Sequence, residues 1–273
     1  MVSRRTCCAG CTVRRPVADR VGTQAALPPE SHRGGGGTLR GSHSEPGFVR
    51  QALRVAAKDL RIEWRSREVF ATMTFLAVVV VLIFSFAFVV EGARPPAPVV
   101  AGILWVAVVL SGTVALSRAF DREREGEAIR SLLLSPAPRS AIYVGKLVAT
   151  AALMLVTETV LTGLCVILFG SRVDVLLARV GLLLVLGTVG FAAAGCVFSA
   201  ALLRARGRDA LLATLLYPLI VPIVIAGARG TAQLLDLKPD LEGAAFWTQF
   251  LFALDILFVT AGVWAFDPVV GGD

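Results

Sequence analysis

The sequence predicts an all-α, polytopic membrane protein with six transmembrane helices. Apolar residues make up 56% of the 273 positions, the mean hydropathy is +0.74, and charged residues account for only 17%. A soluble domain has about 45–50% apolar and about 25% charged residues, and a disordered chain combines low hydrophobicity with high charge. The composition therefore excludes a water-soluble enzyme and a disordered protein.

Six apolar stretches are long enough to cross a hydrocarbon core about 30 Å thick as helices of about 20 residues. They cover residues 72–90, 99–117, 147–169, 180–203, 210–228 and 244–266. A backbone in lipid must satisfy its own hydrogen bonds, so we expect helices in these stretches. The alternation of apolar and polar residues that is typical of barrel strands is absent from the sequence.

The distribution of Lys and Arg predicts the orientation of the spans. With a cytoplasmic N-terminus, the inside loops 118–146 and 204–209 carry nine of these residues and the opposite loops carry five. Positive residues are retained on the cytoplasmic side, so both termini are expected there. The net charge of +7 then reflects topology and contact with anionic lipid, and no nucleic-acid partner is predicted.

Residues 1–47 differ from the rest of the chain, because they are rich in Arg and Gly and lack the apolar core of a signal peptide. We expect a disordered tail or an extension from a start placed too far upstream, and favour the second because the membrane pattern begins near Phe48. The cysteines at 7, 8 and 11 form one C-x-x-C without a second pair, so no metal site is predicted.

Residues 48–68 combine an apolar stripe with a basic face, a pattern typical of a helix that lies flat on a membrane. A solvated leader helix is the alternative. Residues 69–273 then form the six-span domain.

The loop at 118–146 is predicted to hold a short amphipathic helix that docks a partner protein. Its charged opening is followed by an apolar edge, and proline then ends the helix. A merely solvated connector is the alternative. The candidate docking residues are Glu123, Glu125, Gly126, Glu127, Ile129, Leu132, Leu133, Ser135 and Pro136.

Glu158 and Asp255 are expected inside the helix bundle, because a carboxylate facing lipid is costly. Two interpretations stay open: a polar contact at a subunit interface or along a pathway, or a hydrogen-bonded carboxyl that fixes packing. For the second, the nearby threonines at 157, 159 and 162 are the expected partners.

Two prolines and a run of small residues mark the later spans. Pro218 and Pro222 are predicted to kink the fifth span, as a fixed bend or as a moving hinge. The small residues of the fourth span, from Gly187 to Ser199, predict close helix packing.

No catalytic, cofactor-binding or metal-ligating residue is predicted. The sequence lacks a GxxxxGK[ST] phosphate loop and an HExxH zinc motif. Its two histidines precede residue 44, and the cysteine, methionine and tyrosine residues of the spans fit core positions or helix ends better than haem ligation.

Several phrases resemble known families. REREG at 122–126, LLLSP at 132–136 and GKL at 145–147 resemble the second-loop pattern of ABC-2-type exporter permeases. Together with GILWVA at 102–107, LGT at 186–188, LYPLIVP at 216–222 and DILF at 255–258, they resemble the haem exporter protein B (CcmB) family over residues 48–270. The extension at 1–47 departs from that pattern.

The resemblance implies an ABC-2-type permease architecture in a bacterial inner membrane, with two copies of the chain and a separate cytoplasmic ABC ATPase. The loop would carry the coupling helix on that ATPase. The complex would serve cytochrome c maturation by haem export or by release of a haem-loaded chaperone, with other maturation membrane proteins as partners. Haem and ATP would be handled by the complex, with none bound by this chain alone.

Two alternatives to this function remain. One is a generic ABC-2 exporter permease for lipids, drugs or glycans, which a substrate cavity lined by spans two and five would favour. The other is a mechanical or scaffolding subunit that transports nothing.

Overall fold

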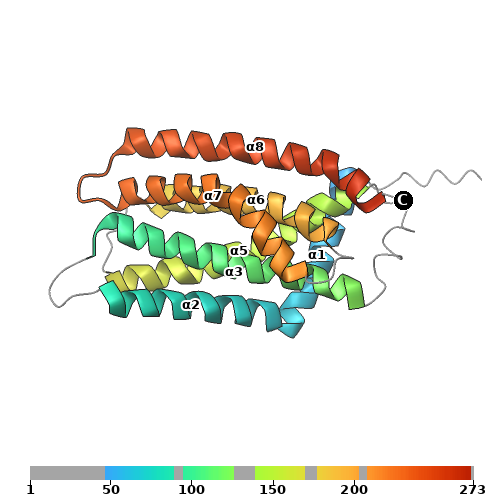
Figure 1. The fold of residues 1–273 in the computed structure, drawn as a ribbon, viewed down its shortest axis with the longest axis horizontal. Helices are drawn as coiled ribbons and strands as arrows, with labels where there is room; N and C mark the ends of the chain where they lie inside the picture. The colour runs from blue at the N-terminus through green and yellow to red at the C-terminus, as the bar shows by residue number, and fades with distance from the viewer. Residues whose placement is uncertain (1–46, 89–94, 126–138, 170–176, 203–207, 272–273) are drawn as a thin grey trace, which may run out of the picture. The chain divides into compact units, whose positions relative to one another are not determined.

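The computed structural model describes residues 47–88, 95–125, 139–169, 177–202 and 208–271, and these residues form seven helices without a strand (Figure 1). Six of the helices are long and apolar enough to cross a membrane, which confirms the predicted all-α polytopic fold. The helices are α1 (Phe48–Ser66), α2 (Glu68–Phe88), α3 (Ala97–Glu125), α5 (Arg139–Phe169), α6 (Leu177–Ala201), α7 (Arg208–Leu235) and α8 (Leu241–Gly271).

The fifth span differs from its predicted position. It was expected at residues 210–228, but the membrane-length segment of α7 covers Thr214–Leu235. Arg229, which was assigned to a loop, therefore lies within a helix. Arginine favours helical backbone and can extend its charged end toward water, so one such residue lowers the hydropathy without ending the helix.

Helix α3 continues beyond the membrane-length segment Ala97–Arg118 to Glu125. The backbone of Glu123 and Glu125 therefore belongs to the last turns of α3 and not to a separate helix that starts after the span. The other candidate docking residues, from Gly126 to Pro136, lie outside the described residues, as does most of the predicted docking helix. The docking role stays a prediction.

Helix α6 is the most enclosed of the six long helices, and three of its glycines, at 187, 190 and 195, admit side chains from neighbouring helices. A Cβ atom at Gly187 would overlap the ring of Trp105 on α3, and one at Gly195 would overlap the side chain of Leu116. The close packing predicted from small residues in this span is confirmed. Such contacts allow backbones to approach in a membrane, where the hydrophobic effect does not drive helices together.

Trp105 joins three helices at the centre of the bundle. Its indole ring lies against Gly187 on α6 and Gly227 on α7, and the side chain is only 2% exposed. The indole Nε1 donates a hydrogen bond of 3.0 Å to the hydroxyl of Thr231, also on α7. A buried Trp needs such a partner for its N–H, so the packing and the polar contact fix the same side chain.

Candidate functional site

The first candidate region is the contact between α1 and α5, the helix that follows the predicted docking loop in the chain. Helix α1 packs mainly on α5. At Gly145 the two backbones approach closely, because a Cβ atom there would lie 2.7 Å from the carbonyl oxygen of Ala52. The ammonium of Lys146 donates to the carboxylate of Asp59 at 3.2 Å. Lys146 is almost fully buried, so the cationic end of this ion pair is shielded from water.

The turn between α1 and α2 is also held by specific contacts. Glu63 is 3% exposed, and one of its carboxylate oxygens accepts a 3.0 Å hydrogen bond from the backbone N–H of Phe70. Arg67 adopts a left-handed backbone with φ of 54°, and its N–H donates to the carbonyl of Glu63. Left-handed backbone is typical of residues that end helices, so α1 meets α2 at a defined corner.

Helix α1 places small side chains and Val55 against α5, and it leaves several larger apolar side chains exposed. Ala52 and Ala56 are buried, whereas Val49, Leu53 and Trp64 are exposed. An exposed apolar face on a basic helix supports the predicted position on the membrane surface, which stays a prediction. The contact of α1 with α5 was not predicted from the sequence. The available signal was the small and basic pair at 145–146, which was interpreted only as part of a loop pattern.

The second candidate region holds the two buried carboxyl groups. Glu158 on α5 accepts a 2.6 Å hydrogen bond from the hydroxyl of Thr188 on α6, and the same hydroxyl lies 2.7 Å from the carbonyl of Leu184. The expected partners on α5 were therefore wrong for Glu158. Thr157 and Thr159 donate instead to backbone carbonyls four residues earlier, a common arrangement for threonine in helices.

Asp255 approaches α6 from another side. Its carboxylate lies against Gly190, where a Cβ atom would be 2.6 Å from Oδ1. Thr188 and Gly190 are two residues apart, about 200° around a helix, so the two carboxyl groups contact different faces of α6. Oε2 of Glu158 and both carboxylate oxygens of Asp255 have no hydrogen-bond partner in the described part of the chain. The structure thus brings both residues to α6 but not to each other.

Helix α7 continues without interruption through Pro218 and Pro222. The bend or hinge at these prolines stays a prediction. As for metals, no group of three or more His, Cys, Asp or Glu residues is placed to hold an ion within the described ranges.

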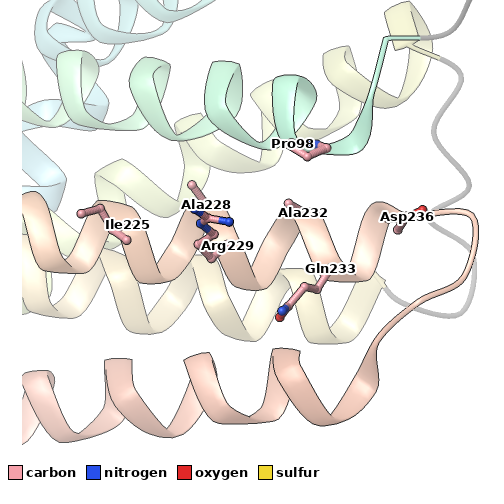
Figure 2. A pocket seen from close by; sticks show the side chains of 7 residues that line it. All are labelled: Pro98, Ile225, Ala228, Arg229, Ala232, Gln233 and Asp236. Carbon is pink, nitrogen blue, oxygen red and sulfur yellow. The ribbon is translucent and has the colours of Figure 1, made fainter.

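The third candidate region lies between α3 and α7, which are the second and fifth spans. An apolar pocket of about 400 Å³ is lined by Val106, Val109, Leu110, Tyr217, Ile220, Val221, Val224 and Ile225. A second pocket of about 570 Å³ is lined by Pro98, Ile225, Ala228, Arg229, Ala232, Gln233 and Asp236 (Figure 2). The two pockets share Ile225, and we call them together the α3–α7 groove. The groove is apolar along one part and polar at the end of α7.

Comparisons with known proteins agree on one family. The family model described as "CcmB protein" matches residues 50–270. The Heme exporter protein B of Pseudomonas aeruginosa is 30% identical over 156 residues, which cover 56% of this chain and 68% of that protein. The protein of the same name from Haemophilus influenzae is 27% identical over 175 residues, covering 63% and 77% respectively. That of Escherichia coli K12 is 30% identical over 98 residues, covering 35% and 43%.

Proposed function

Because the chain belongs to the CcmB family, we propose that it is the transmembrane subunit of an ATP-driven complex for cytochrome c maturation, which exports haem or releases a haem-loaded chaperone. The observation that carries this proposal is the family match, which extends from α1 to the end of α8. The six apolar helices of a multi-pass membrane protein are consistent with the match.

In this proposal a separate ABC ATPase supplies the energy and binds the loop between α3 and α5. The chain itself has no phosphate-binding loop in its sequence, so ATP would be bound by that partner. Closure of the ATPase would move the loop, and the loop would move the helices on either side of it. Such coupling requires an element with two states that nucleotide binds unequally.

The remaining parts of the proposal concern placement and assembly. The family match supports a bacterial inner-membrane location, and the Lys and Arg distribution supports a cytoplasmic position of both termini. We place two copies of the chain in the complex, next to other maturation membrane proteins. Haem would be held by those partners, because the sequence offers no histidine within its spans.

The test is recovery of partners by a tagged chain in mild detergent, followed by mass spectrometry. The proposal expects an ABC ATPase together with haem-handling membrane proteins. The L132D/L133D variant should lose the ATPase and cytochrome c maturation while still inserting in the membrane. The S131D/A137D variant adds the same charge to the loop without changing the apolar edge, and it should keep both. Retention of the ATPase and of maturation by L132D/L133D would refute the docking role.

A second candidate function is supported by the α3–α7 groove. A generic ABC-2 exporter permease is expected to line a substrate cavity with its second and fifth spans, and this groove is lined by those spans. Recovery of an ATPase without haem-handling proteins would favour this function over cytochrome c maturation.

A further inference from the structure

The α3–α7 groove changes its chemistry along the length of α7. From Tyr217 to Ile225 its lining is almost wholly apolar, and beyond Ile225 it contains Arg229, Gln233 and Asp236. Figure 2 shows these residues along α7, with Pro98 on the neighbouring α3. The distance along the helix axis from Tyr217 to Arg229 is about 18 Å, close to the roughly 15 Å depth of one leaflet's hydrocarbon layer.

Arg229 is an exposed cation that lines the groove on the membrane-length part of α7. It is exposed and lies about 9 Å before the end of the membrane-length part of α7. The described residues provide no carboxylate within ion-pair distance of its guanidinium. A cation at this depth is costly unless an anion meets it, and guanidinium groups bind phosphate with two parallel hydrogen bonds. The position therefore favours a phosphate group.

Asp236 supplies the opposite charge two helical turns later. It is seven residues after Arg229, one residue beyond the end of α7, and both residues line the same pocket. Its carboxylate is exposed and accepts a local 2.6 Å hydrogen bond from the N–H of Leu237. Asp236 also follows directly after the last residue of α7, where the helix dipole is negative and carbonyl groups lack partners within the helix. A cationic group is favoured here.

We propose that the α3–α7 groove binds a zwitterionic phospholipid whose headgroup carries a phosphate and a primary amine. The order along the groove is apolar surface, cation and anion, and it complements the order of acyl chain, phosphate and ammonium in such a lipid. One acyl chain lies along the apolar part between Val106 and Val221, the phosphate contacts Arg229, and the amine lies at Asp236. This inference does not depend on the proposed function, because it concerns a lipid site on the chain itself.

The charge pattern argues against the other occupants. A tetrapyrrole that carries only carboxylates would meet Arg229, but it would bring no cation to Asp236. A glycerol-headgroup phospholipid carries the phosphate without the amine, so Asp236 would repel its negative charge or leave it unaffected. A second copy of the chain would exclude lipid from the groove, and the experiment below distinguishes it by cross-linking.

The test uses the full chain, purified with its partners and placed in lipid nanodiscs. The probes are photoactivatable phospholipids with identical acyl chains and either an ethanolamine or a glycerol headgroup, and labelled peptides are identified by mass spectrometry. We expect the ethanolamine lipid to label α3 and α7 next to the groove. R229Q should reduce this labelling about tenfold, as loss of a charge-assisted contact worth roughly 1.4 kcal/mol would. R229K should restore part of it.

D236N separates the amine contact from the phosphate contact. It should lower labelling by the ethanolamine lipid several-fold and leave the glycerol lipid unchanged or slightly increased. R179Q on α6 and E242Q on α8 are controls that each remove an exposed charge outside the lining of the groove. They should change labelling by neither lipid. Undiminished labelling in R229Q, equal labelling by both lipids in the unmodified chain, or a groove that neither lipid labels would overturn the proposal. If neither lipid labels the groove because a second chain fills it, the V221C variant should form a disulfide between two copies of the chain.

Discussion

Replacing Asp59 with asparagine tests whether charge as well as packing holds α1 on α5. The carboxylate of Asp59 lies 3.2 Å from the ammonium of Lys146, and their side chains are 24% and 5% exposed. Asparagine has nearly the same size, so packing against α5 is kept. The variant removes the negative charge and leaves the cation of Lys146 in an almost closed site.

The expected loss of stability follows from this geometry. Removing one partner of a fully buried pair costs about 3–5 kcal/mol, because it strands a buried charge. Water reaches the Asp59 side of this pair, so we expect about 2 kcal/mol for D59N. K146M removes the buried cation itself and should cost less, because no buried charge then remains at this position. Lys58 lies 3.7 Å from the same carboxylate with its side chain 52% exposed, so K58M should change stability by less than about 0.5 kcal/mol.

The free energy of unfolding can be measured in mixed detergent micelles by titration with a denaturing detergent. The exposed Trp64 places a fluorophore on α1 itself. We expect the order D59N, K146M, K58M from most to least destabilised. The double variant D59N/K146M should resemble K146M, because neither variant keeps the buried cation. If D59N and K58M are destabilised equally, the ion pair contributes nothing and the reasoning is refuted.

Two further variants test contacts on α6 by the same measurement. G187A should destabilise the bundle by about 1–3 kcal/mol, because its Cβ overlaps the indole ring on α3. In the control G181A the Cβ meets open space, so the free energy of unfolding should stay unchanged or rise by up to about 1 kcal/mol. Equal effects of the two variants would contradict the packing. T188V removes the hydroxyl that donates to Glu158 and should cost about 0.6–1.7 kcal/mol, whereas T159V, at an exposed hydroxyl bonded to its own helix, should cost less. A cost for T188V no larger than that for T159V would show that this contact does not stabilise the bundle.

The six spans could be predicted from the sequence, because lipid forces each apolar stretch of sufficient length to form a complete helix. The end of the fifth span could not be placed in the same way. Hydropathy falls at Arg229, but the helix continues to Leu235 through its backbone hydrogen bonds. A pattern of apolar residues reports the cost of burial in lipid, and it says little about where a helix stops near the membrane surface.

The partners of individual polar groups were harder to predict for a different reason. Local spacing pointed to threonines beside Glu158, whereas the actual donor, Thr188, is thirty residues away in sequence on another helix. The amphipathic pattern of α1 likewise indicated a polar and an apolar face, but it could not reveal that two small alanines pack on α5. A single sequence shows that a buried polar group needs a hydrogen-bond partner. It does not show which residue that partner is, because this depends on how the helices pack.

The packing of α5 gives the proposed coupling a physical route. The loop at 126–138 joins α3 to α5, so a force on the loop acts on these two helices first. Helix α5 is bound to α1 by the buried Lys146 pair and to α6 by the contact of Glu158 with Thr188. Helix α7 contacts α3 and carries two prolines, each of which removes one backbone donor from its helix. Motion of the loop would therefore displace α1, α5 and α6 together, while α7 supplies the more deformable side of the bundle.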